Sequence, residues 1–443
     1  MVVKPKKTVI TLTLLDTCFV GILLIIFGGI VLHAPLSVGL GTLFPSAELF
    51  IKSWKEILML LAGSIMLVIL HQKKRWDVLK SPLIYLIAAF AALHLVLLLV
   101  FPQGITATVA GLMIDLRYLF FFVLVYVAVC LYPSLRRTFV ITFFVGAFVV
   151  AAFALLQVFV LPRDILTYIG YSNTTIAPFL TVDQNSQYIR INSTLRGPNP
   201  LGAYVIIVLS LLAAAWLKIR QVQPRRHMLA LSVIVIGSLV ALWSSYSRSA
   251  LIATLVAIGI ITVVVIGKRI PKKFWIILVV VIDLVAAAIF FGRSTNFVSN
   301  VVLHNNATTG ATVDSNAGHA VSLSEGLLRL VRQPIGAGVG STGSASLYGP
   351  QPLIVENQYL FIAHEAGWLG LIVFVVITVM VLRALWRRRE NWLALGVFAS
   401  GIGLVFVGLV LPVWVDDTVA IIWWGLAAVA LAGKESHGRT INK

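Results

Sequence analysis

Apolar runs of about twenty residues, separated by short charged segments, dominate this chain of 443 residues. A helix of about 20 apolar residues crosses the hydrocarbon core of a bilayer. Backbone polar groups in lipid must be satisfied within the structure itself, which favours helices over open strands. Only 11% of the residues are charged, whereas a soluble domain has about a quarter. The sequence therefore predicts an all-α polytopic membrane protein.

Twelve of these runs are expected to be transmembrane helices. The first follows MVVKPKK and is longer than the apolar core of a cleavable signal, so we expect it to remain as a helix. The expected helices cover residues 9–32, 56–71, 82–101, 113–132, 138–161, 200–217, 228–246, 250–266, 274–291, 358–382, 392–413 and 418–433.

The net charge of +18 could suggest a nucleic-acid partner, but its location points elsewhere. Basic segments such as VKPKK, QKKRWDVLK and RALWRRRE fall on the same side of the membrane in this topology, and they hold most of the 34 Lys and Arg residues. Such segments mark cytoplasmic loops and adjoin anionic lipid headgroups. Both termini are therefore expected to be cytoplasmic, and no nucleic-acid partner is expected.

Two extracytoplasmic loops are long, and they divide the chain into three parts. Residues 1–291 would hold nine helices and the first outer loop, 162–198. Residues 292–357 would form a large second loop, in which VSLSEGLLRLV predicts a short amphipathic helix near 320–332. Residues 358–443 would hold three helices and a cytoplasmic tail. Loops of this length are usually functional or disordered.

Two arginines precede a helix start in the first loop. Arg190 and Arg196 lie in QYIRINSTLRGPNPLGAY, where Asn199 can be the N-cap and Pro200 the first helical residue. A helix N-terminus beside arginines suits an anion, and the planar guanidinium binds phosphate oxygens in pairs. Arginines that merely decorate a solvated loop are the alternative.

A third arginine, Arg248, lies in WSSYSRSALIA between two apolar runs. An arginine so close to hydrocarbon is costly unless it faces protein or a water-filled cavity. The alternative is a structural arginine that extends to the outer surface. Lys52 and Lys55, which flank Trp54, are interpreted as interfacial anchors.

The segment ENQYLFIAHEAGWLG places polar residues at the outer end of a predicted helix. Partial burial would raise the pKa of Glu356 towards that of a general base, although a carboxylate is also favourable at a helix N-terminus for its dipole. Asn357 and His364 share a face, whereas Glu365 is about 13 Å deeper than Glu356 and half a turn out of phase. We interpret Glu365 as a buried hydrogen-bonding group and His364 as a structural histidine.

Several other kinds of site are not expected. Cys18 and Cys130 lie in apolar runs and imply no disulfide framework. No cluster of His, Cys, Asp and Glu has the spacing of a metal site, and neither a P-loop nor a Gly-x-Ser-x-Gly elbow is present.

In these motifs, taken in order and with the predicted topology, the chain resembles the O-antigen ligase and polymerase superfamily. The motifs are Arg190 with the Pro-Asn helix entry, Arg248 within SRSA, and Glu356-Asn357 nine residues before Gly367-x-x-Gly370. The segment RQPIGAGVGS is similar to a Pro-x-x-Gly-x-Gly stretch of the family. Two positions depart from the pattern. Characterised ligases carry histidine in place of Glu356, and many members carry arginine in place of His319.

The resemblance implies a GT-C-like, metal-independent glycosyltransferase without a cofactor, in the bacterial cytoplasmic (inner) membrane. The donor would be a glycan on a polyprenyl diphosphate, as undecaprenyl diphosphate, and the acceptor a hydroxyl of a glycan, lipid or protein, as in lipopolysaccharide and cell-envelope biogenesis. Arg248 and Arg190 would stabilise the leaving diphosphate, and Glu356 would act on the hydroxyl. Arg196, Asn199 and Asn357 would bind substrate.

Other functions stay open at this point. A surface-polysaccharide polymerase of the same superfamily would differ only in its acceptor. A twelve-helix transporter or flippase would need charged residues near the bilayer midplane. Asp16, Asp283 and Glu365 are the evident candidates, without obvious basic partners, and the absence of an internal repeat weakens this alternative.

Overall fold

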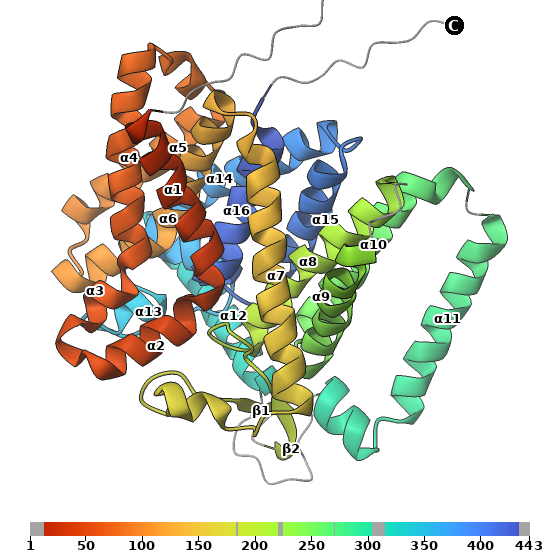
Figure 1. Cartoon of the computed structure of the whole chain (residues 1–443). Coiled ribbons are helices and arrows are strands. Elements are labelled where there is room, and N and C mark those ends of the chain that lie inside the picture. The colour runs from red at the N-terminus through yellow and green to blue at the C-terminus, as the bar shows by residue number, and fades with distance from the viewer. Residues whose placement is uncertain (1–12, 183–184, 220–224, 270, 304–314, 434–443) are drawn as a thin grey trace, which may run out of the picture.

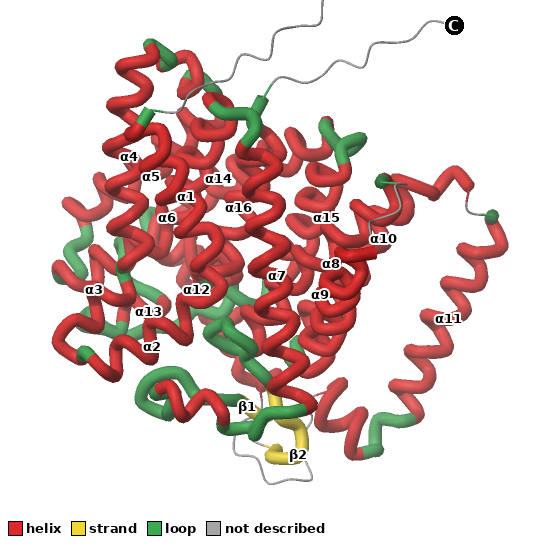
Figure 2. The backbone as a smooth tube through the Cα atoms, in the orientation of Figure 1, coloured by secondary structure: helices red, strands yellow, loops and turns green. Residues whose placement is uncertain are grey.

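A helix lies in each of the twelve predicted ranges of the computed structural model, which describes residues 13–182, 185–219, 225–269, 271–303 and 315–433 (Figures 1 and 2). These helices are α1 (Leu14–Gly29), α4 (Trp54–Lys73), α5 (Pro82–Val100), α6 (Ile105–Leu131), α7 (Leu135–Phe159), α8 (Pro198–Lys218), α9 (Arg225–Ser244), α10 (Arg248–Ile266), α11 (Lys272–Phe291), α14 (Gln358–Arg387), α15 (Trp392–Val407) and α16 (Asp417–Leu431). The predicted start of the first helix, at residue 9, lies outside the described residues.

Eight segments of the described chain are long and apolar enough to cross a membrane. Three shorter apolar helices, Met228–Ser244, Trp392–Val407 and Asp417–Leu431, accompany them. The first span runs further than predicted, because α1 continues through a 3₁₀ turn at Ile30–Leu32 into α2 (His33–Leu43). A polytopic helical membrane protein is thus confirmed, whereas the number of twelve spans stays a prediction.

Helix α16 forms the centre of the bundle, and its composition explains why. Every residue from Thr418 to Leu431 is buried, and Trp423 and Trp424 are among the largest fully buried side chains. A helix that is apolar on all sides needs neighbours on all sides. These neighbours are α6, α7, α8, α14 and α15. Figure 1 shows α16 among them.

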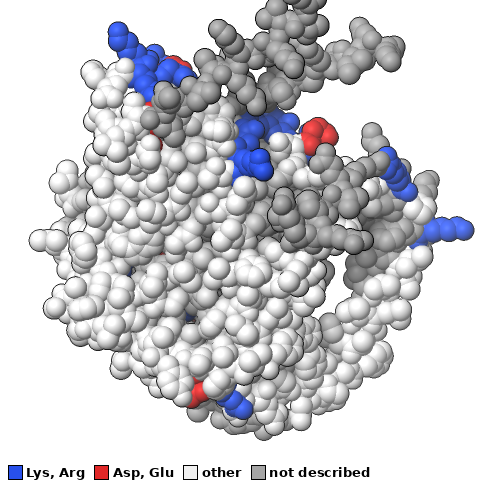
Figure 3. All heavy atoms as spheres, in the orientation of Figure 1, with Lys and Arg blue, Asp and Glu red and all other residues white. Residues whose placement is uncertain are grey.

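The periphery of the bundle is apolar as well. Leu95, Val96 and Leu99 on α5 are largely exposed, and so are Ile252 and Leu255 on α10. An exposed apolar surface of this extent marks contact with a membrane or a partner. Figure 3 shows a broad uncharged surface on the face in view, with most visible Lys and Arg toward the end where the C-terminus lies.

The loop between α7 and α8, predicted as the first outer loop, contains strands, which the all-α prediction did not include. Strand β1 (Leu180–Val182) pairs antiparallel with β2 (Asn185–Arg190), and Leu180 lies opposite Arg190. A short 3₁₀ helix, Ile165–Ile169, precedes them. Since these strands lie outside the bundle, they change the prediction for the loop and leave the helical core as expected.

The segment between α11 and α14, predicted as the second outer loop, contains α12 (Ser315–Arg332) and the short helix α13 (Gly343–Ser346). Helix α12 confirms the amphipathic helix predicted near 320–332. Helix α12 and the β1–β2 hairpin lie at the end of the molecule opposite the C-terminus (Figure 1). Both long loops therefore gather at one end of the bundle.

Asp16 has a basic partner, contrary to the expectation for the acids within helices. Its carboxylate accepts a hydrogen bond from Lys73 Nζ at 3.1 Å and another from the Tyr132 hydroxyl. These contacts join α1 to α4 and to the end of α6. We interpret a paired acid at a helix end as structural. Asp16 is therefore no longer a candidate for the charged pathway of a transporter.

Candidate active site

Glu356 and His319 form a hydrogen-bonded ion pair at the end of the bundle that holds the long loops. Glu356 Oε2 lies 2.7 Å from His319 Nδ1, and both side chains are partly exposed. The backbone N–H of Glu356 donates to Ser322 Oγ at 3.3 Å. His319 and Ser322 are one turn apart on α12, so one face of this helix holds both the side chain and the backbone of Glu356.

The pair shifts both titrations. The hydrogen bond from His319 lowers the pKa of Glu356, and it outweighs burial, which raises that pKa. The prediction of a raised pKa at Glu356 is therefore wrong, because a basic partner sits where only burial was expected. The hydrogen bond to Glu356 in turn raises the pKa of His319, against burial and against the positive charge of Arg248.

Arg248 begins α10 and lies close enough to act on His319 electrostatically. Its Nη1 donates to the carbonyl oxygen of Val302 at 3.2 Å, in a π-helical turn (Val298–Leu303) that follows α11. The side chain is half-buried. The structure thus brings together Arg248 and the Glu356–His319 pair, two of the three motifs that the sequence singled out.

Arg190 reaches the same region through the turn that precedes Arg248. Its Nε donates to Ser245 O at 2.8 Å, and its Nη2 donates to Asn199 Oδ1 at 2.6 Å. The next backbone N–H, of Ile191, donates to Ser244 O at 3.1 Å. One guanidinium therefore ties the hairpin, the α9–α10 turn and the start of α8 to each other.

The predicted cap of α8 is wrong by two residues. The helix begins at Pro198 with Gly197 as the N-cap, so Pro198 takes the first helical position that was assigned to Pro200. Two prolines, at 198 and 200, both suit a first turn, and the sequence does not distinguish them. Asn199 is consequently inside the first turn, where its side chain orients Arg190 instead of capping the helix.

Arg196 and Asn357 interact with other parts of the protein. Arg196 is exposed, and its charge acts on the buried carboxylate of Asp416, the N-cap of α16. Asn357 is the N-cap of α14, where its Oδ1 accepts from the N–H groups of Tyr359 and Leu360. Its Nδ2 donates to Leu409 O at 2.7 Å. Both polar ends of Asn357 are therefore engaged within the protein.

Aromatic rings accompany the arginines, a feature that the motif search missed. The Tyr188 ring lies 6.2 Å from that of Tyr246 and 6.5 Å from that of Phe297. Tyr188 and Tyr246 each precede a site arginine by two residues. Tyr246 also has a φ of 48°, a left-handed conformation that is uncommon for a bulky residue. The shared spacing of tyrosine and arginine in both motifs is the sequence feature that could have indicated these rings.

Helix α14 breaks at Gly367, whose φ of 66° and ψ of −168° are outside the helical region. The carbonyl groups of His364 and Glu365 accept hydrogen bonds from the backbone of Ala337 and Gly338. The backbone N–H of Trp368 donates in turn to Pro334 O at 2.9 Å. The glycine-rich segment 334–340 therefore replaces the helical partners that the break removes, and the two family motifs form one structural unit.

Glu365 is fully buried in this unit, as predicted. Its Oε1 accepts from the Thr342 N–H at 3.2 Å, and its carboxyl adjoins that of Asp115. Asp115 also forms a hydrogen bond with His94, with 3.2 Å between Asp115 Oδ2 and His94 Nε2. Since all three residues are buried beneath the loop, Glu365 belongs to the support of the glycine-rich segment and not to the Glu356 pair.

A second charged cluster lies between α2, α4, α6 and α16. Asp417 Oδ2 lies 2.9 Å from both His33 Nε2 and Lys55 Nζ, and its Oδ1 contacts Arg117. Lys55 is 3% exposed, so it is no interfacial anchor as the sequence suggested. The sequence feature that could have indicated this cluster is Arg117 in MIDLRY, where charged residues interrupt an apolar run.

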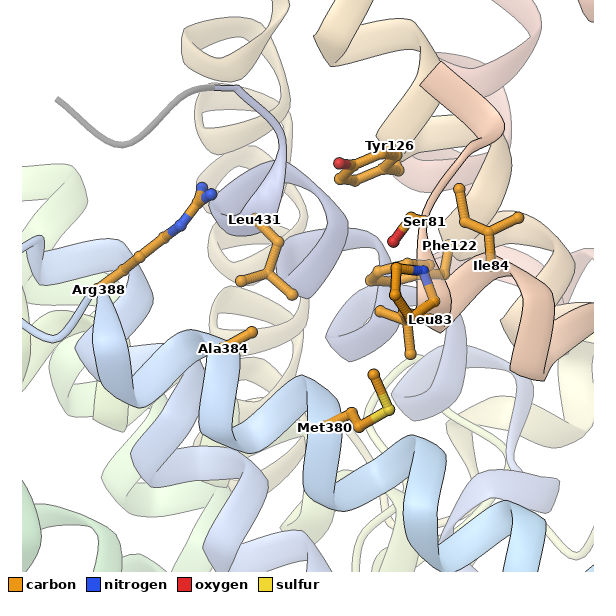
Figure 4. Close-up of a pocket in the computed structure, with 10 residues that line it drawn as sticks. Ser81, Leu83, Ile84, Phe122, Tyr126, Met380, Ala384, Arg388 and Leu431 are labelled. Carbon is orange, nitrogen blue, oxygen red and sulfur yellow. The ribbon is translucent and has the colours of Figure 1, made fainter. Parts of the chain in front are cut away.

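One partly open cavity of the described chain lies away from this pair. A cavity of about 210 Å³ is lined by residues of α5, α6, α14 and α16, with Tyr126, Met380 and Arg388 at its wall (Figure 4). Arg388 follows the C-terminal end of α14, so the cavity is at the end of α14 opposite Glu356. Among the described residues, no three His, Cys, Asp or Glu side chains gather so that they could hold a metal ion.

Fold and site together define a polytopic membrane protein that gathers arginines and an acid–base pair at one end of its bundle. Residues 233–375 match the O-antigen ligase family, which confirms the resemblance to the O-antigen ligase and polymerase superfamily. The matched segment includes Arg248, His319 and Glu356, whereas Arg190 precedes it. No curated protein matches the chain.

Proposed function

We propose that the protein is a membrane glycosyltransferase that moves a glycan from a polyprenyl diphosphate, such as undecaprenyl diphosphate, to an acceptor hydroxyl. The observation that carries this proposal is the meeting of Arg248 with the Glu356–His319 pair inside the family-matched segment. A diphosphate leaving group needs positive charge, and a hydroxyl nucleophile needs a proton acceptor. The site offers both.

Arg248 and Arg190 serve the diphosphate in this proposal. Arg190 contacts the α9–α10 turn at Ser245 O, and Arg248 is the first residue of α10, whose helix dipole adds to the positive potential. Asn199 orients Arg190, Asn357 holds the start of α14, and the exposed Arg196 contacts the donor at the edge of the site. No metal or cofactor is required if the arginines carry the charge.

The reaction takes place on the outer face of the bacterial cytoplasmic membrane in this proposal, with both termini in the cytoplasm. The separation of the basic helix ends from the two long loops supports this orientation. The lipid tail enters laterally between helices, so a site at the end of the bundle keeps the diphosphate near the headgroups. Residues 292–357 then form the extracytoplasmic loop over a bundle of twelve spans.

Transfer by purified protein tests this function. The protein in proteoliposomes is incubated with a lipid-linked oligosaccharide and a glycan or lipid acceptor, with and without EDTA. We expect product in both cases, and we expect Arg248→Ala to lower the rate by about 10²–10³-fold, as loss of one transition-state donor does. Arg163→Ala, an exposed arginine of the first loop, is the matched control and should keep the wild-type rate.

The product distinguishes the remaining alternatives. A single transfer en bloc identifies a ligase, and a ladder of repeat lengths identifies a surface-polysaccharide polymerase. Uptake of the donor without a new glycosidic bond would identify a transporter or flippase and refute the proposal. Unchanged turnover in both Arg248→Ala and Glu356→Gln would remove the assignment of the site.

A further inference from the structure

We propose that His319 is the general base of this site and that Glu356 is the residue that positions it. The inference rests on the proposed transferase function and assigns a role to a residue of α12 that the motifs leave without one. It reverses the expectation from sequence, in which Glu356 itself receives the proton.

The geometry defines which nitrogen is available. His319 Nδ1 faces Glu356 Oε2 at 2.7 Å. An ionised carboxylate only accepts hydrogen bonds, so Nδ1 carries a proton, and in the neutral imidazole Nε2 therefore holds the lone pair. A carboxylate that fixes the tautomer of a histidine is the arrangement by which a base is oriented. The side chain of His319 remains 37% exposed, so a substrate hydroxyl can reach it.

Further contacts hold α12 at a fixed place beside α14. Glu356 N–H donates to Ser322, one turn after His319. Further along, Trp368 Nε1 donates to Leu330 O at 2.6 Å. A Cβ atom on Gly326 would lie 2.7 Å from the Leu360 side chain, which shows how closely the helices approach between these points. The two helices therefore run side by side in the same direction, and the position of His319 is set by several independent contacts.

The charges around His319 also suit a base. Glu356, ahead of α14, raises the pKa of the imidazole, and Arg248, on α10, lowers it. Among the described residues, these two charged groups shift the pKa of His319, and the net effect is a pKa above the ordinary value of 6.5. Glu356 has the opposite shift, so its carboxylate accepts a proton less readily than an ordinary glutamate does.

The transfer step follows with all atoms in balance. The acceptor oxygen forms a bond to the anomeric carbon of the donor sugar. The bond from that carbon to the diphosphate oxygen breaks, and its electron pair leaves with the lipid diphosphate, whose charge Arg248 offsets. The proton of the acceptor hydroxyl passes to His319 Nε2, while Nδ1 keeps its hydrogen bond to Glu356.

Two substitutions separate the base from the positioning residue. His319→Gln can still donate to Glu356 but cannot take a proton, so we expect transfer to fall about 10²–10⁴-fold. Glu356→Gln can still accept from Nδ1 and keeps the base, so the loss should be smaller, on the order of 10-fold. His71→Gln, an exposed histidine at the far end of α4, is the matched control and should leave the rate unchanged.

The pH profile of kcat/KM for the acceptor decides the matter. Wild-type activity should rise with pH, with its inflection at the pKa of His319, and should reach a plateau above that pH. Glu356→Gln should move this inflection to lower pH, because the carboxylate that raises the histidine pKa is gone while Arg248 remains. His319→Gln should lose the inflection.

Two results would overturn the inference. One is a wild-type rate and profile in His319→Gln, and the other is a Glu356→Gln enzyme as inactive as His319→Gln and without an inflection. The transferase function would survive either result, provided that the wild type forms product and Arg248→Ala lowers the rate by about 10²–10³-fold. If the wild type forms no product, the proposed function itself fails.

Discussion

His319 Nδ1 lies 2.7 Å from Glu356 Oε2 and thereby joins a helix of the second outer loop to the residue that precedes α14. The two residues are 37 positions apart in the sequence, so the contact connects two elements that are not adjacent along the chain. Its strength depends on the protonation of both partners, so it gives the loop a pH-dependent attachment to the bundle.

This attachment predicts a pH window for the docking of α12. A raised pKa means that the contribution of His319 is complete below about 6.5 and is lost as pH rises through its higher folded value. A lowered pKa means that the contribution of Glu356 is complete above about 4.5 and is lost at lower pH. Docking should therefore be strongest between these values.

Hydrogen exchange of α12 measures this window. After correction for intrinsic exchange, protection should be greatest between about pH 4.5 and 6.5. Both side chains are over a third exposed, so solvent screening limits the effect to about 1 kcal/mol, a few-fold in protection. In Glu356→Gln the dependence above pH 6.5 should weaken. Equal protection at all pH values in the wild type would show that the pair does not hold α12.

The break in α14 predicts an intolerance of side chains at Gly367. Its φ and ψ fall in a region that is essentially restricted to glycine. A Cβ there would also lie 2.5 Å from the carbonyl carbon of Ile335. Gly367→Ala should lower the free energy of unfolding by at least about 1–3 kcal/mol, measured by denaturation in detergent.

Gly259→Ala is the control for that measurement. Gly259 lies within α10, and a Cβ there would meet nothing within 4 Å. Alanine should stabilise this helix by roughly 0.5–1 kcal/mol. The prediction fails if both substitutions change stability equally.

The buried cluster predicts a strong dependence on Asp417. Asn at this position would leave Lys55 and Arg117 without the carboxylate that they share. Loss of one partner from a buried pair costs about 3–5 kcal/mol, so Asp417→Asn should lower the thermal midpoint clearly. Glu48→Gln breaks the exposed Lys52–Glu48 pair and should cost at most about 1 kcal/mol. Similar midpoints for the two variants would contradict the role given to the cluster.

Arg190 predicts a difference between two basic residues. Lysine keeps the charge but cannot reach Ser245 O and Asn199 Oδ1 at once, because it lacks the planar fork. Arg190→Lys should therefore lower the stability by about 1.5–3 kcal/mol, the scale of a hydrogen bond to a charged group. Lys218→Arg, which keeps its exposed contact with Glu390, should show no such loss. Wild-type stability in Arg190→Lys would mean that the guanidinium does not join the three segments.

The sequence predicted those features that depend on composition along one helix. Apolar length placed a helix in each of the twelve ranges, although α6 begins at Ile105 instead of residue 113 and α15 ends at Val407 instead of residue 413. Helix α12 follows from its amphipathic pattern. Arg248 at the start of α10 and Glu356 ahead of α14 were likewise visible, because charged residues next to apolar runs are rare.

Contacts between distant segments were not predictable in this way. In the sequence Gly367 was evident only as part of a Gly-x-x-Gly motif, yet it marks the break that segment 334–340 repairs. His319 had no role, because its partner is 37 residues away in the sequence. The pKa of Glu356 was predicted with the wrong sign for the same reason.

The repair of α14 sets a limit on how this protein can be rebuilt. Loops of membrane enzymes are natural pieces to exchange when specificity is to be altered. Here the last part of the second loop, from Pro334 to Gly340, supplies backbone hydrogen bonds to the helix that follows it. A chimaera that takes the whole loop from a relative would separate halves that fit only each other. Segment 334–340 must therefore stay with α14, and so must α12, which contacts the same region through His319 and Leu330.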